Sequence, residues 1–168
     1  MTCASGDVPF DSYPRNASYD EVNQREIRSL IFHLLYAMEA FEYDTSLESI
    51  IDNFNKGFEL HIPMQGVVAK MVQQIIDSRN ELDEQIKPLL HNWRFERLGV
   101  CTKIILRYAL WELKNSDCAP AIILNEAIEL GKCFSEKDAY KFINGILDEA
   151  LKKMGIEITP KPVVEQQS

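Results

Sequence analysis

The chain has 168 residues, of which 46% are hydrophobic and 26% are charged, and its formal net charge is −8. This length allows a buried hydrophobic core, and the negative charge disfavours a general polyanion binder, because nonspecific nucleic-acid affinity depends on neutralising phosphates. No apolar run approaches the roughly 20 residues that a membrane span needs, and residues 1–14 lack the basic and apolar regions of a secretory signal. We therefore expect no membrane association and a cytoplasmic location.

The chain opens with residues 1–17, which show no hydrophobic period and are predicted to be a flexible lead. Apolar residues then recur in steps of three and four, which predicts an amphipathic helix over residues 20–43. Thr45 and Glu48 have the spacing of a capping box, and Gly57 suits the end of a helix. These signals predict a short second helix between them.

A long third helix is predicted over residues 63–91, because Pro63 suits a first helical turn and apolar residues recur as far as Leu89. Asn80 is the expected position of a bend in this helix. The three helices would together form an N-terminal subdomain over residues 18–92.

The second part of the chain centres on Cys101–Leu113, a predicted helix that is apolar on nearly all sides and so belongs in the middle of a bundle. Two more helices are predicted after it, one opened by Pro120 and one that starts near Ser135 and Asp138. They would form a C-terminal subdomain of three or four helices over residues 93–154.

No segment alternates with the period of a β-strand, so the sequence predicts an all-α fold of two packed helical bundle subdomains. A disordered tail is predicted over residues 155–168. The sequence also lacks the patterns that catalysis or metal binding needs, with no Walker loop, no Gly-x-Gly-x-x-Gly and no Cys-x-x-Cys. We therefore expect the protein to be no enzyme and to hold no metal or cofactor.

One charged residue, Arg107, lies inside the apolar central helix. Burying a guanidinium without a partner would cost several kcal/mol. Glu126 lies at the margin of the apolar face of the helix that Pro120 opens. We therefore predict a structural ion pair between Arg107 and Glu126.

Two groups of residues are candidates for nucleic-acid contact. Arg25 and Arg28 lie one turn apart at the start of the first helix, where a solvated face is the commoner outcome and a phosphate contact is the alternative. The second group combines cations with aromatic rings near the start of the last helix, a combination that can hold and stack single-stranded RNA. Its members are Lys132, Lys137, Tyr140, Lys141 and Phe142, of which Phe142 also fits the periodicity of the core.

Three motifs in the second part of the chain, Ile105–Leu113, Ile123–Lys132 and Lys141–Asp148, occur in an order and at a spacing that resembles the NusB family of bacterial transcription antitermination factors. The segment Arg28–Tyr36 is similar to the arginine-led opening helix of that family, and the resemblance covers residues 20–152. It implies an all-helical, non-enzymatic protein that binds boxA RNA together with the ribosomal protein NusE. Such a pair helps RNA polymerase to read through terminators.

The resemblance also implies roles for individual residues. Arg25 and Arg28 match the family's basic opening. The family's RNA-proximal region matches Asp138, Lys141 and Phe142 at the start of the last helix. Scaffold roles are implied for another set, in which the glycine would lie where two helices cross closely: Arg107, Glu112, Glu126, Asn144 and Gly145.

The opening helix departs from the family pattern, because Arg25 alone stands before Arg28 where the family often has a dense arginine run. We therefore expect weak, salt-sensitive RNA binding by the isolated protein, with the partner contributing more. Two alternatives stay open at this point. One is a detached helical module related to the N-terminal part of some ribosomal-RNA cytosine methyltransferases, and the other is a homodimeric regulatory protein whose dimer hides the RNA face.

Overall fold

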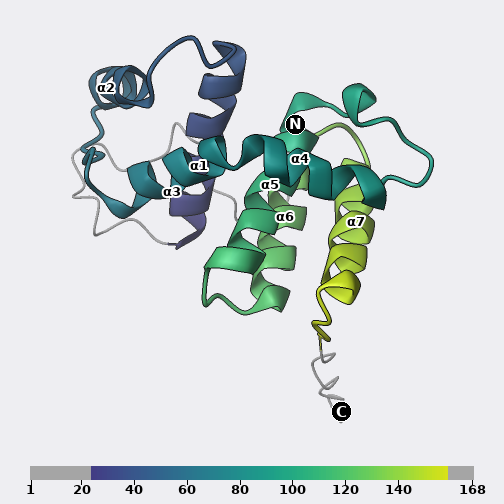
Figure 1. Ribbon diagram of the computed structural model, residues 1–168. Helices are drawn as coiled ribbons and strands as arrows, with labels where there is room; N and C mark the ends of the chain where they lie inside the picture. The colour runs from purple at the N-terminus through teal and green to yellow at the C-terminus, as the bar shows by residue number, and fades with distance from the viewer. Residues whose placement is uncertain (1–23, 159–168) are drawn as a thin grey trace, which may run out of the picture.

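The computed structural model describes residues 24–158, and this part of the chain is helical and contains no strand (Figure 1). The predicted all-α class is therefore confirmed. The α-helices are α1 (Gln24–Ala40), α2 (Leu47–Phe58), α3 (Val67–Asp77), α4 (Arg79–Ile86), α5 (Val100–Asn115), α6 (Pro120–Phe134) and α7 (Ala139–Lys153), and the short 3-10 helices η3 (Lys87–Leu89) and η4 (Phe95–Arg97) lie between α4 and α5. The predicted lead, residues 1–17, and the part of the tail after residue 158 lie outside the described residues.

Helix α5 is the central helix of the fold, as its sequence predicts. All residues from Ile104 to Glu112 are buried. The helix packs against α1, α3, α4, α6 and α7, and α4 crosses it (Figure 1). A helix that contacts neighbours on all sides needs apolar residues around its whole circumference, which explains the continuous apolar run.

The hydrophobic core is continuous through both parts of the chain. Its fully buried side chains include Leu34 of α1, Leu106 of α5 and Leu147 of α7. Helix α1 connects the parts, because it packs against α2 and α3 and also against α5 and α6. The predicted division into subdomains near residue 92 falls in the segment between η3 and η4, and it stays a prediction.

The prediction of one long third helix is wrong, because two α-helices take its place. Helix α3 ends at Asp77 and α4 begins at Arg79. The residue between them, Ser78, has φ −88° and ψ 2°, which is outside the helical region and interrupts the helical path. The break lies two residues before the expected bend at Asn80. After this break α4 crosses α5 (Figure 1). Its Asp83 binds Arg107 of the central helix.

The ends of α2 also differ from the prediction. Ser46 is the N-cap rather than Thr45, and its hydroxyl accepts a hydrogen bond from the backbone N–H of Ser49 at 3.2 Å. Gly57 lies inside the helix, which ends one residue later with Glu59 in the left-handed region at φ 54°. The local capping pattern therefore predicted the place of this helix correctly, but both of its predicted ends differ from the observed ones.

Two helix boundaries in the second part of the chain agree with their sequence signals. Pro120 is the first residue of α6, where its missing N–H costs no intrahelical hydrogen bond. Gly155 follows α7 with φ 71°, a conformation that favours glycine. None of the helices in the described part of the chain is long and apolar enough to cross a membrane.

Candidate nucleic-acid interface

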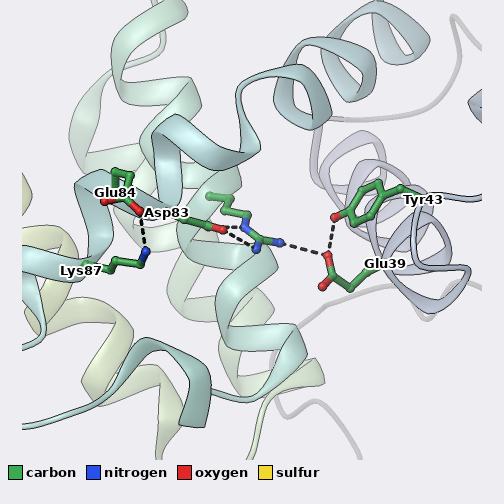
Figure 2. A network of polar contacts seen from close by, with 6 residues as sticks. Glu39, Tyr43, Asp83, Glu84 and Lys87 are labelled. Atoms are coloured by element: carbon green, nitrogen blue, oxygen red, sulfur yellow. Dashed lines mark hydrogen bonds and ion pairs between the residues drawn. The ribbon is translucent and has the colours of Figure 1, made fainter.

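The buried Arg107 joins α5 to α1 and α4. Figure 2 labels its two partners, Asp83 and Glu39, which lie on opposite sides of the unlabelled side chain that they bind. Its Nε and Nη2 donate to the two carboxylate oxygens of Asp83 at 2.6 and 2.9 Å, and its Nη1 donates to Glu39 Oε2 at 3.0 Å. The prediction that Glu126 is the partner of Arg107 is therefore wrong. Burial alone lowers the pKa of Arg107, but the hydrogen bond and charge of Asp83 raise it above its ordinary value. The guanidinium stays charged as a structural link.

Glu126 pairs instead with Arg25, one of the residues predicted to contact RNA. Arg25 Nη2 donates to Glu126 Oε1 at 3.2 Å, and the two side chains are 36% and 14% exposed. The contact holds Arg25 against α6 while part of its side chain faces solvent. Arg25 therefore stays a candidate for a phosphate contact, although Glu126 offsets part of its charge.

Arg28, the second arginine of the opening helix, lies in the interior. Its Nη2 and Nε donate to the carboxylate of Glu112 at 3.1 and 3.4 Å, and Nη2 also lies 3.4 Å from Cys118 Sγ. The side chains of Arg28 and Glu112 are only 9% and 8% exposed. Burial raises the pKa of Glu112, whereas the positive charge of Arg28 acts in the opposite direction.

This placement argues against a phosphate contact by Arg28, which stays an untested prediction. Helix α1 lies against both α5 and α6, so Arg25 points to α6 while Arg28 points to α5. A phosphate could reach Arg28 only if the buried ion pair opened, which would leave Glu112 unpaired in the interior at a cost of several kcal/mol. We therefore propose a scaffold role for the buried Arg28–Glu112 pair.

Three of the predicted residues come together where α6 ends and α7 begins, and we call Lys132, Tyr140 and Lys141 the α6–α7 junction. The ammonium groups of Lys132 and Lys141 lie 5.4 and 5.8 Å from the centre of the Tyr140 ring. Lys132 pairs with Glu129 at 3.0 Å, and Lys141 pairs with Asp138 at 3.3 Å. The lysine side chains are 43% and 66% exposed, so both cations are accessible to a ligand.

A glycine on α6 allows the two helices to approach closely at this junction. A Cβ atom on Gly131 would lie 2.9 Å from Ile143 Cδ1 and 3.2 Å from the Cα of Tyr140, so a larger residue would require both neighbours to shift. This close crossing brings Lys132 beside Tyr140.

The resemblance implied that Gly145 lies at a close helix crossing, but Gly145 is exposed, and an added Cβ would have no heavy atom within 4 Å. That assignment is wrong.

A groove of about 220 Å³ lies between the segment before α5 and the start of α7, and we call it the Trp93 groove. It includes three residues that the sequence analysis selected: Lys137, Asp138 and Phe142. It also includes two that the analysis missed, Trp93 and Arg97. Trp93 is 58% exposed, and its ring meets that of Phe142 edge to face with centroids 5.9 Å apart. Trp93 and Arg97 lie close together in a short segment without helical periodicity. This combination is the sequence signal that could have revealed the groove.

The start of α7 differs from the predicted cap in a way that matters for the groove. Asp138 occupies the N-cap position in the left-handed region at φ 63°, and its side chain makes no capping hydrogen bond. Ser135 is buried, with its hydroxyl 3.4 Å from that of Thr102. The Asp138 carboxylate therefore pairs with Lys141 rather than capping the helix, and Asp138 is one of the residues that line the groove.

Acidic residues accompany the cations of both predicted groups, so the groups do not form one uninterrupted positive surface. Arg25 meets α6 at Glu126, and Lys132 is paired with Glu129, one turn farther along the same helix. Since Arg28 is buried, the α6–α7 junction and the adjoining Trp93 groove carry most of the accessible predicted residues.

Comparison with known proteins identifies the family. The model of the NusB family matches residues 25–152. The transcription antitermination protein NusB of Macrococcus caseolyticus is 36% identical over 132 residues, which cover 78% of this chain and 98% of the relative. NusB of Staphylococcus carnosus is 38% identical over 126 residues, which cover 75% and 97%. The solved structure of T. maritima NusB superposes with a TM-score of 0.65 at 28% identity and covers 79% of this chain and 92% of that one. The chain therefore belongs to the NusB family.

Proposed function

We propose that this protein is a non-enzymatic adaptor of transcription antitermination. It binds single-stranded boxA-type RNA together with the ribosomal protein NusE and helps the RNA polymerase antitermination complex to read through terminators. The names of its relatives support the antitermination role. The observation that carries the RNA-binding role is the grouping of Lys132, Tyr140 and Lys141 beside the Trp93 groove. Cations near exposed rings suit single-stranded RNA, because they neutralise phosphates while the rings stack on bases.

The charges of the chain imply that the isolated protein binds RNA weakly. The net charge is −8, and both junction lysines already have a carboxylate neighbour. Both side chains of the Lys141–Asp138 pair are exposed. Such a pair contributes only about 0–1 kcal/mol, so a phosphate can replace Asp138 as the partner of Lys141. The long-range field nevertheless opposes RNA, and NusE would supply the remaining affinity.

A second exposed surface is suited to the protein partner. Tyr36 on α1 is 45% exposed, and its ring stacks on Phe32 with centroids 6.4 Å apart. Phe32 in turn stacks on Phe134 of α6 at 4.6 Å, so the exposed ring rests on a rigid aromatic row. Rigid exposed aromatic rings are enriched in protein interfaces. We therefore propose Tyr36 as a contact for NusE.

Charge reversal tests the RNA surface. Labelled boxA-type RNA would be titrated with the protein in the presence of NusE and followed by fluorescence anisotropy. The double variant Lys132→Glu/Lys141→Glu should lose at least about tenfold in affinity, because two phosphate contacts become repulsive. The matched control is Lys56→Glu/Lys152→Glu, which reverses two lysines that also pair with a carboxylate one turn away. Its affinity should change much less.

Three results would count against these assignments. Equal losses in the two double variants would reject the α6–α7 junction as the RNA surface. An absence of RNA binding by the unmodified protein with NusE would reject the proposed function. Unchanged NusE binding by Tyr36→Asp, measured by calorimetry without RNA, would reject the partner surface alone.

A further inference from the structure

We propose that an exposed face of α2 carries a docking groove for an arginine-bearing segment of a protein partner. The groove, which we call the α2 groove, has a volume of about 310 Å³ and is lined by α2 and by the segment that follows it. Its lining residues are Glu48, Ser49, Ile51, Asp52, Asn55 and Met64. None of these residues belongs to the α6–α7 junction, to the Trp93 groove or to the aromatic row around Tyr36. The α2 groove is therefore an additional surface of the fold.

The wall of the groove that carries Met64 is fixed before any partner binds. The Asn55 amide group donates to the backbone carbonyl of Ile62 at 3.1 Å, and its side-chain oxygen accepts from the Ile62 N–H at 2.8 Å. A tight turn follows, in which the N–H of Gly66 donates to the carbonyl of Pro63 at 3.0 Å. Met64 lies in the chain between these two attachments. A preformed groove loses less conformational entropy when a partner binds.

The groove has an apolar floor and an apolar wall. Ile51 is 1% exposed and belongs to the core, whereas Met64 is 38% exposed. Phe58 is 40% exposed and lies one turn after Asn55, so it continues the same face of α2. Exposed methionine and aromatic side chains beside a groove are typical of protein interaction surfaces, because methionine adapts its shape to a partner. The apolar wall favours an occupant with an aliphatic part.

Charge determines the rest of the occupant. Glu48 and Asp52 are four residues apart on α2, so their carboxylates lie on the same face and both border the groove. Asp52 pairs with Lys56 at 2.6 Å, but the two side chains are 55% and 74% exposed. Such a pair is weak in solvent, so an incoming cation can replace Lys56. The same carboxylates would repel a phosphate, which excludes RNA as the occupant.

Arginine is the side chain that satisfies both parts of the groove. Its aliphatic stem would pack on Met64, while its planar guanidinium would donate to the carboxylates of Glu48 and Asp52. A lysine would supply only a point charge without this forked geometry. The net charge of −8 further favours a basic partner, because it attracts such a segment at long range.

The test uses the full-length protein with isotope-labelled methionine methyl groups and follows the Met64 signal by NMR. The probe is the capped peptide acetyl-Gly-Leu-Arg-Leu-Gly-amide, which should shift the Met64 signal in a saturable way. A second peptide, in which the uncharged isostere citrulline replaces arginine, should bind several times more weakly. Glu48→Gln/Asp52→Asn should weaken binding of the arginine peptide by about three- to tenfold, because two exposed charge contacts are lost.

The matched control is Glu84→Gln/Asp148→Asn, which changes the net charge equally and removes two exposed carboxylates that also pair with a lysine one turn away. Its affinity for the arginine peptide should stay close to that of the unmodified protein.

Four results would overturn the docking groove. They are an unmoved Met64 signal in the arginine titration, equal binding of the citrulline peptide, equal losses in the two double variants, and a saturable Met64 shift caused by boxA-type RNA in place of the peptide. The peptide measurements contain neither RNA nor NusE. Their failure would therefore leave the proposed function intact.

Discussion

The interior of the protein and its α6–α7 junction use the same kind of contact, a cation beside a carboxylate, with different consequences. The side chains of the Arg28–Glu112 pair are 9% and 8% exposed, whereas those of the Lys141–Asp138 pair are 66% and 56% exposed. Opening the interior pair leaves an unpaired buried charge at a cost of several kcal/mol, while the exposed pair contributes about 0–1 kcal/mol. The comparison shows how burial limits which cations can exchange their partner for a phosphate.

The largest effect is expected from breaking the interior pair. Arg28→Ala should lower the free energy of unfolding by about 3–5 kcal/mol, because Glu112 would be left buried without its partner. Urea denaturation followed by circular dichroism measures this change. Lys152→Ala is the control, since the exposed lysine pairs with Asp148 in solvent, and the stability of this variant should change much less than that of Arg28→Ala.

Replacing both members of the pair separates the scaffold role of Arg28 from an RNA contact. Arg28→Met/Glu112→Leu should recover most of the stability that Arg28→Ala loses, because no buried charge is left unpaired. It should also keep the RNA affinity of the unmodified protein. If the double variant folds but binds RNA as weakly as the junction variant Lys132→Glu/Lys141→Glu, Arg28 contacts RNA and the assignment made here fails.

A smaller loss of stability is expected at Arg107, because its partners are closer to solvent. The side chains of Asp83 and Glu39 are 15% and 25% exposed, so water can solvate them partly when the guanidinium is removed. Arg107→Ala should therefore cost about 3 kcal/mol, the lower end of the range for a broken buried pair. A loss below about 1 kcal/mol in urea denaturation would show that the link among α1, α4 and α5 adds no more than a surface pair.

The smallest effect on stability is expected at high pH from Tyr43, which contacts Glu39 in the network around Arg107. Burial and the hydrogen bond to Glu39 raise the pKa of Tyr43 from 10.0 to about 12 (Figure 2). A raised pKa means that the folded state favours the neutral phenol, so its stabilising effect is fully present below pH 10.0 and is lost as the pH rises through about 12. The difference in tyrosinate absorbance between the unmodified protein and Tyr43→Phe measures this titration. A midpoint near 10.0 would contradict it.

The sequence predicted the all-helical class and the place of most helices, because these depend on local periodicity, whereas its end signals were less accurate. The continuous apolar run of α5 and the proline that opens α6 are local features, and so is the group Lys132, Tyr140 and Lys141. Gly131 then brings Lys132 beside Tyr140 by a close helix crossing that no local pattern specifies.

The wrong or missing assignments depend on how helices pack. The partner of Arg107 was missed because Ser78 turns α4 across α5 and moves Asp83 to the interior. Arg25 and Arg28 have the same residue type on the same helix, and only the position of α5 distinguishes them. Trp93 was missed because it lies outside any periodic segment.

The salt dependence of RNA affinity tests the central claim most directly. For single-stranded RNA, each lost phosphate contact reduces the slope of log affinity against log salt by about 0.7. With NusE present, Lys132→Gln/Lys141→Gln should therefore have a shallower slope than the unmodified protein, and Arg28→Met/Glu112→Leu should have the same slope as the unmodified protein. An unchanged slope for the lysine variant together with a reduced slope for the Arg28 variant would contradict the account, because the phosphates would then be held by the opening helix.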